Sequence, residues 1–229
     1  MDDDNDSVAY IVRMSSRRLY VVYRGTDDTE DLMHDADLFL EPLDPAIAHV
    51  KDAKVHRGFQ CIYKDLKASV VPRVDAFMTD DDHNNLTFVG FSMGAAVAAI
   101  AALAFATKFP GGRVSFVGLG MPRVGNQAWA RAFDASVPDA VRVVNGCDCI
   151  CKVPFGNSYT HVGRDVHVGH TDMHPNIPVL TALVDHKLIA YAKNIDTFVS
   201  AGGQAPATPT AVNHIMDILR ALFSGKWWW

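Results

Sequence analysis

The residues whose chemistry is easiest to recognise lie in the apolar stretch from Leu86 to Ala106. Residues Gly90–Gly94 read G-F-S-M-G, a G-x-S-x-G motif between a β-rich segment, LTFV, and an Ala-rich helical run. In such a sharp strand-to-helix turn the serine is strained, and the flanking glycines remove side chains that would collide. The backbone N–H of Met93 then lies at the helix N-terminus, where it can help bind a developing oxyanion. The motif predicts that Ser92 is an activated nucleophile.

The same stretch has a competing interpretation as a membrane span. It carries no charged side chain from Leu86 to Ala106, and a spanning helix needs about 20 apolar residues. The motif after a β-rich segment favours instead a buried central strand followed by a buried helix. The many alanines of that helix would let it pack closely on a sheet.

A nucleophilic serine needs a base and an orienting acid, and in α/β-hydrolases the chain order is Ser, Asp or Glu, then His. Asp148 follows the strand-like segment AVRVVNG, so its carboxylate would lie just past a strand end. His186 sits between the apolar segment IPVLTALV and a helical pattern, but spacing alone does not separate it from other histidines. The competing acids are Asp165, Asp172 and Asp185, and the competing bases are His161, His167, His170, His174 and His214.

Alternating strand and helix patterns must position these groups. Two strands around a polar turn are expected over residues 9–25, and buried strands over 113–120 and 140–146. Helices are expected from Gly58 onward, with Pro72 kinking or splitting the first, and over 129–137 and 186–195. Residues 158–169 suggest a hairpin. The order predicts an α/β fold with a mostly parallel central sheet flanked by helices.

Composition indicates one sizeable domain, since the 229 residues are 49% hydrophobic. We expect an α/β-hydrolase domain over residues 1–199, a linker over 200–211 and a C-terminal amphipathic helix with a Trp tail over 212–229. A net charge of -5 speaks against a nucleic-acid partner. The acidic opening MDDDNDS lacks the pattern of a secretory signal. Localisation stays open, with an intracellular protein favoured over a secreted one.

The cysteines raise the question of a metal site. Cys147, Cys149 and Cys151 alternate along the chain and could share one face of a strand. With nearby histidines such as His167, His170 and His174 they are candidate ligands, although their spacing is not that of a zinc ribbon or finger. Reduced thiols and solvated histidines are favoured, so we expect no metal and no cofactor.

Several blocks, in order, resemble those of the class 3 lipases, the fungal-type triacylglycerol lipase family of α/β-hydrolases. The resemblance runs from about Tyr10 to Tyr191. The matching blocks are VVYRGTDDTEDLMHD, VHRGF, GFSMGAAVAAIAA, GMPRVGNQAWA, RVVNGCDCICKVP, YTHVG and DHKLIAYA.

The resemblance implies roles for individual residues. Ser92 would be the nucleophile, Asp148 the acid and His186 the base. The backbone N–H of Thr26 would join that of Met93 in the oxyanion hole, and the segment from about Asp27 to Asp37 would be a lid. The implied function is a serine carboxylic ester hydrolase acting on acylglycerols or related lipid esters. The alternative is a lipase-like protein that binds without catalysis.

The departures from the family pattern concern the surroundings of these residues. Phe91 stands where His is usual in the elbow, and Leu32 stands where the lid often has Trp. The family's longer N-terminal region is absent, so we expect a shortened N-terminus. The lid and the tail Trp227–Trp229 are candidate contacts with a lipid surface, although packing of the C-terminal helix on the body is favoured. The oligomeric state does not follow from the sequence.

Overall fold

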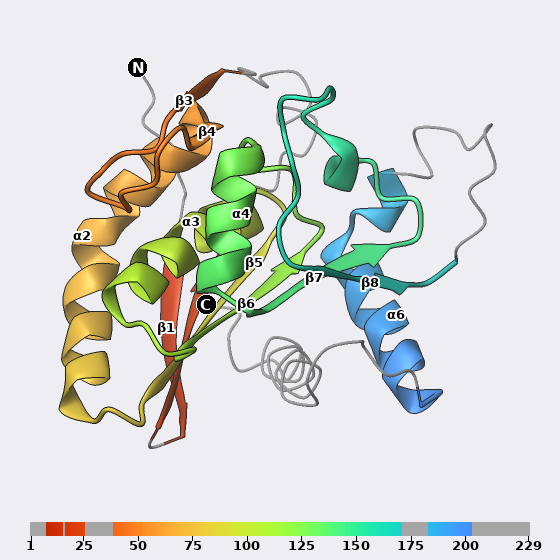
Figure 1. Ribbon diagram of the computed structural model, residues 1–229. Coiled ribbons are helices and arrows are strands. Elements are labelled where there is room, and N and C mark those ends of the chain that lie inside the picture. The colour runs from red at the N-terminus through yellow and green to blue at the C-terminus, as the bar shows by residue number, and fades with distance from the viewer. Residues whose placement is uncertain (1–7, 16, 26–38, 171–182, 203–229) are drawn as a thin grey trace, which may run out of the picture.

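A six-stranded sheet forms the centre of the molecule (Figure 1). The computed structural model describes residues 8–15, 17–25, 39–170 and 183–202. The sheet order is β1-β2-β5-β6-β7-β8; β1 is antiparallel to β2, and the other neighbours pair in parallel. The mostly parallel α/β sheet predicted from the sequence is confirmed. Its strands are β1 Ala9–Ser15, β2 Arg18–Tyr23, β5 Asn85–Phe91, β6 Val114–Leu119, β7 Asp139–Asn145 and β8 Arg164–Val168.

The register of the central strands brings their carboxyl ends to one edge of the sheet. Phe91 at the end of β5 pairs with Leu119 at the end of β6. Leu119 in turn pairs with Val143, two residues before the end of β7. Because parallel strands run in the same direction, the residues that follow β5 and β7 emerge at this same edge.

Helices cover both faces of the sheet. One core cluster joins the sheet to α2 Arg57–Asp80, α3 Met93–Lys108 and α4 Gln127–Ser136. A second cluster on other strand residues includes Tyr191 and Ile195 of α6 Leu188–Ser200, which lies beside β7 and β8 (Figure 1). Helix α3 is buried on almost every side, which explains why its sequence shows no polar face. Further elements in the described part of the chain are β3 Leu40–Pro42, β4 Lys54–His56 and the short helix η1 Ile150–Lys152.

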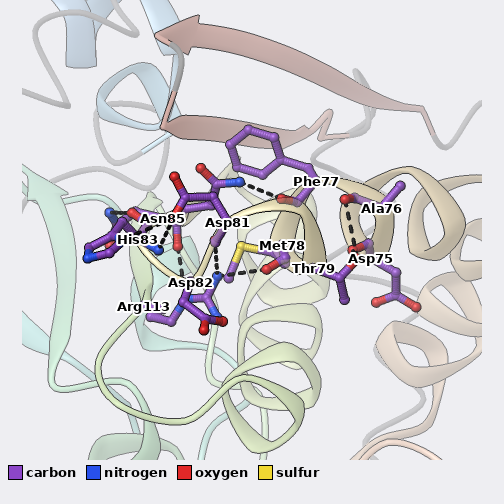
Figure 2. A network of polar contacts seen from close by, with 11 residues as sticks. Asp75, Ala76, Phe77, Met78, Thr79, Asp81, Asp82, His83, Asn85 and Arg113 are labelled. Atoms are coloured by element: carbon purple, nitrogen blue, oxygen red, sulfur yellow. Dashed lines mark hydrogen bonds and ion pairs between the residues drawn. The ribbon is translucent and has the colours of Figure 1, made fainter.

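Arg113 secures the end of α2 where the chain turns into β5 (Figure 2). Its Nη2 donates to the carbonyl oxygens of Met78 and Asp81 at 2.8 and 3.0 Å, and its Nε donates to that of Asn84 at 2.9 Å. The last carbonyls of a helix have no partner within the helix, so this guanidinium satisfies groups that would otherwise need water. The start of β5 is thereby fixed, seven residues before Ser92.

The structure corrects two local predictions. Residues 158–169 do not form a hairpin, since β8 is their only strand. This strand pairs in parallel with β7, along the edge of β7 that β6 does not occupy. Helix α2 continues through Pro72 as one element of 24 residues, so, of the predicted kink or split, the split does not occur. The predicted lid and, from residue 203 on, the linker and C-terminal helix lie outside the described residues. Within the described residues, no helix is both long and apolar enough to cross a membrane.

Candidate active site

Ser92 sits in a strained turn between β5 and α3. Its backbone has φ 55° and ψ −128°, a conformation that residues with a side chain rarely adopt. A Cβ at Gly90 would lie 2.4 Å from backbone atoms of Gly94 and Ala95, and a Cβ at Gly94 would lie 2.4 Å from the carbonyl oxygen of Tyr23. The motif glycines are therefore required by the close approach of β2, β5 and α3 around the serine.

Ser92, His186 and Asp148 lie in one row of hydrogen bonds. The Oγ of Ser92 is 2.8 Å from Nε2 of His186, and Nδ1 of His186 is 2.7 Å from Oδ2 of Asp148. A carboxylate can only accept, so Nδ1–H donates to Asp148 and leaves Nε2 free to accept the serine proton. All three residues are buried, with exposures of 0%, 2% and 0%. Burial strengthens the electrostatic contacts among them.

The Asp148 carboxylate is held by further donors. Its Oδ1 accepts the backbone N–H of Ile150 at 2.9 Å, and its Oδ2 accepts the hydroxyl of Tyr191 at 2.5 Å. The Tyr191 oxygen itself accepts the backbone N–H of Asn145 at 3.1 Å. Burial, together with Cys151 and Asp148 nearby, raises the pKa of Tyr191 well above its ordinary value. The hydroxyl therefore stays protonated and donates to the carboxylate.

Two residues shape the space around the imidazole. The ring of Phe91 stacks on that of His186, with centroids 4.9 Å apart. A Cβ at Gly120 would lie 2.9 Å from Cε1 of His186, and Gly120 has a positive φ of 59°. No role for either residue follows from the sequence. In the sequence, Phe91 is notable only because it replaces the His that is usual in the family, and Gly120 only because it begins a block that resembles the family.

The competing acids and bases among the described residues have other partners. Asp165 pairs with Arg142, and Asp185 pairs with His170. Nε2 of His161 is 2.5 Å from the carbonyl oxygen of Cys151. Desolvation and the charge of Arg142 lower the pKa of His161 to about 4. His167 is exposed, and its Nε2 lies 4.0 Å from Oδ2 of Asp165. Asp172, His174 and His214 lie outside the described residues.

The oxyanion-hole candidates are described only in part. Met93 is the first residue of α3, so its N–H is one of the donors that a helix start leaves without a helical partner. Thr26 lies outside the described residues, as does the lid segment after it. Gly25, the residue before Thr26, lies against the elbow: a Cβ there would be 2.7 Å from the carbonyl oxygen of Phe91 and 3.4 Å from Cβ of Ser92.

Comparisons with known proteins point to one family. The family model for lipase (class 3) matches residues 20–158. A secreted mono- and diacylglycerol lipase of Malassezia globosa is 30% identical over 141 residues, which are 59% of this chain and 46% of that protein. One of Malassezia restricta is 30% identical over 159 residues, covering 66% of this chain and 50% of that protein. The chain thus spans about half the length of these curated relatives.

Solved structures show the same fold. The lipase of Rhizopus microsporus var. chinensis superposes with a TM-score of 0.63 at 29% identity, covering 69% of this chain and 56% of that one. Lipase II of Rhizopus niveus superposes with a TM-score of 0.67 at 24% identity, covering 79% and 74% of the two chains. The α/β-hydrolase fold expected from the sequence is therefore confirmed.

The relatives also bear on localisation. Several of the curated relatives that match, including those from Malassezia globosa, are named as secreted lipases. The preference for an intracellular protein, drawn from an acidic opening that lacks the pattern of a secretory signal, is therefore wrong.

The family assignment depends on the match along the chain. The family model covers more than half of the residues, from β2 to beyond η1. Both the G-x-S-x-G turn and the loop that carries Asp148 fall within it. The chain belongs to the class 3 lipase family.

Proposed function

We propose that the protein is a serine carboxylic ester hydrolase that cleaves acylglycerols or related lipid esters. The observation that supports this most directly is the continuous row of hydrogen bonds from Ser92 through His186 to Asp148. The substrate class rests on the relatives, which are named as mono- and diacylglycerol lipases. Secretion is proposed on the names of the same relatives.

In the proposed reaction Ser92 Oγ attacks the ester carbonyl while Nε2 of His186 takes its proton. The negative oxygen of the tetrahedral intermediate is stabilised by the N–H of Met93 and, we propose, by that of Thr26. His186 then returns the proton to the leaving alcohol, which gives an acyl-enzyme. Water attacks this ester by the same route, releases the fatty acid and restores Ser92. Asp148 holds the imidazole tautomer and supports its positive charge.

The lipid substrate makes surface contact a related question. Val184 and Ile189, on either side of His186, are 49% and 65% exposed. Such exposed apolar side chains near a lipase site support contact with a lipid surface. The lid segment and the Trp tail are further candidate contacts. Flotation with diacylglycerol-containing vesicles, comparing the chain with a variant that lacks Trp227–Trp229, tests the tail; equal flotation would exclude it.

Replacement of Ser92 tests the proposed function. Ser92→Ala should stay folded and lower the hydrolysis of a soluble nitrophenyl ester by at least about 10³-fold, because the nucleophile is lost. Ser69→Ala, at an exposed hydroxyl on α2 that donates to the carbonyl of Leu66, is the matched control and should keep full activity. Equal activity of Ser92→Ala and the parent would contradict the proposal.

A fluorophosphonate probe separates the enzyme from the alternative of a lipase-like binding protein. The folded parent should be labelled covalently, and Ser92→Ala should not be. The binding-protein alternative is supported if folded parent protein, verified by circular dichroism, takes up no label. In that case the serine is present but has no activated oxygen.

A further inference from the structure

A second cluster of reactive side chains lies directly beside the proposed triad. One ligand atom each from Cys147, His170 and Asp185 lies within 4.8 Å of the others. Cys147 is a cysteine outside any disulfide, in the loop after β7, and His170 follows β8. The proposed mechanism uses none of these three side chains.

The geometry of the cluster is fixed by backbone contacts. Oδ2 of Asp185 accepts the N–H of Cys147 at 2.8 Å and lies 3.0 Å from Nε2 of His170. Gly146 leaves the room for this approach, since a Cβ there would be 2.5 Å from Oδ2 of Asp185 and 2.8 Å from Nε2 of His170. Cys147 and Asp185 are buried at 5% and 8% exposure, whereas the His170 side chain is 44% exposed. The imidazole gives the cluster a side open to solvent.

The donor set fits a particular class of cation. Thiolate sulfur, imidazole nitrogen and carboxylate oxygen are the ligand types of Zn²⁺, and three protein ligands leave a fourth position for water. We propose that Cys147, His170 and Asp185 together bind one divalent cation of the zinc type. On binding, the thiol proton and any proton on Nε2 of His170 pass to solvent, so that both atoms present a lone pair.

The cluster lies next to two residues of the proposed triad in the sequence. Cys147 directly precedes Asp148, and Asp185 directly precedes His186. A bound cation would therefore join the loop that carries the proposed acid to the segment that carries the proposed base. It takes no part in the ester hydrolysis, and the proposal does not depend on that activity.

Cobalt binding tests the proposal on the full, untagged chain. Protein stripped with a chelator and kept reduced is titrated with Co²⁺, and the thiolate-to-cobalt absorption band is followed. We expect one equivalent of Co²⁺ to develop the band and Zn²⁺ to displace it. Cys147→Ser and His170→Ala should abolish it. The matched controls Cys61→Ser, at an exposed thiol on α2, and His167→Ala, at an exposed imidazole on β8, should keep it.

Thermal unfolding supplies a second readout. Zn²⁺ in excess should raise the Tm of the parent by several degrees, because a ligand that binds only the native state stabilises it. Zn²⁺ should leave the Tm of His170→Ala unchanged. Because His170 is exposed, this variant should fold, and it can test the proposal even if Cys147→Ser does not fold. Absence of the band in the parent would overturn the proposal. So would a band that survives His170→Ala, or one that Cys61→Ser removes. The contacts of Asp185 with His170 and with the N–H of Cys147 would then be the whole role of the cluster.

Discussion

The two halves of the proposed active site are held in different ways. On the nucleophile side, backbone packing positions Ser92: Gly90, Gly94 and Gly25 let β2, β5 and α3 approach so closely that no side chain fits between them. On the acid and base side, hydrogen bonds between side chains distant in sequence do the positioning. Asp148 accepts from Tyr191, 43 residues away, and from His186, 38 residues away.

This difference determines how each half should respond to substitution. A backbone turn either forms or fails, so changes at its glycines should affect folding and activity together. A hydrogen-bonded row can lose one member while the chain around it stays folded. Substitutions on the acid and base side should therefore lower turnover while costing less stability than changes at the glycines of the turn. The following predictions test that contrast.

The largest expected effect is on the acid. Asp148→Asn should lower kcat for a soluble ester by about 10³–10⁴-fold, because an amide favours the wrong imidazole tautomer and does not support its charge. Urea unfolding should show a much smaller change in stability. Asp165→Asn, at the competing carboxylate that pairs with Arg142, should keep kcat within a few-fold of the parent. Similar losses in the two variants would mean that Asp148 is not the acid.

The same contrast explains what the sequence could and could not predict. The elbow is local, because strand, glycines, serine and helix follow one another within residues 86–106, so the motif predicts it directly. The partners of Ser92 are not local. His170 and Asp185 have the right types and lie in the right part of the chain, yet they pair with each other. The position just past a predicted strand pointed to Asp148, although competing acids stayed open, and only the family resemblance selected His186 over its neighbours.

The misjudged hairpin has a similar cause. Residues 158–169 have the composition of two short strands, but β8 finds a long-range partner in β7. Thr160, in the first part of this segment, instead forms an antiparallel β-bridge with Gly125. The stacking of Phe91 on His186 likewise joins residues that only the folded sheet brings together. The local sequence pattern does not determine these long-range contacts.

On the nucleophile side, Gly90→Ala should cost about 3 kcal/mol of unfolding free energy or more and remove activity. The new Cβ would lie 2.4 Å from backbone atoms that cannot move without opening the turn. Gly156→Ala is the control: its φ is 103° but no atom lies within 4 Å of the added Cβ. Backbone strain alone should then cost about 1–2 kcal/mol, with activity retained. If Gly90→Ala and Gly156→Ala shift the urea midpoint equally, the backbone atoms near Gly90 can move to make room for the added Cβ.

On the acid and base side, Tyr191→Phe should lower kcat about tenfold with KM unchanged. The variant removes the donor to Oδ2 of Asp148 and the acceptor of the Asn145 N–H. These buried groups lose a partner each, so the unfolding free energy should fall by about 1–2 kcal/mol. Tyr10→Phe, at an exposed tyrosine of β1, should change neither quantity. A fall in stability with no fall in kcat would limit Tyr191 to a structural role.

The smallest expected effect is a difference between two inactive variants at the serine. With φ 55° at Ser92, Ala keeps the strain of about 1–3 kcal/mol, whereas Gly relieves it at an entropic cost of about 0.5–1 kcal/mol. Ser92→Gly should therefore be more stable than Ser92→Ala by about 1 kcal/mol in urea unfolding. At Ser69, within α2, the order should reverse, because Gly destabilises a helix by about 1 kcal/mol relative to Ala. The same order at both positions would mean that position 92 stores no strain, and the nucleophile side would then need another account of why its glycines and serine stand where they do.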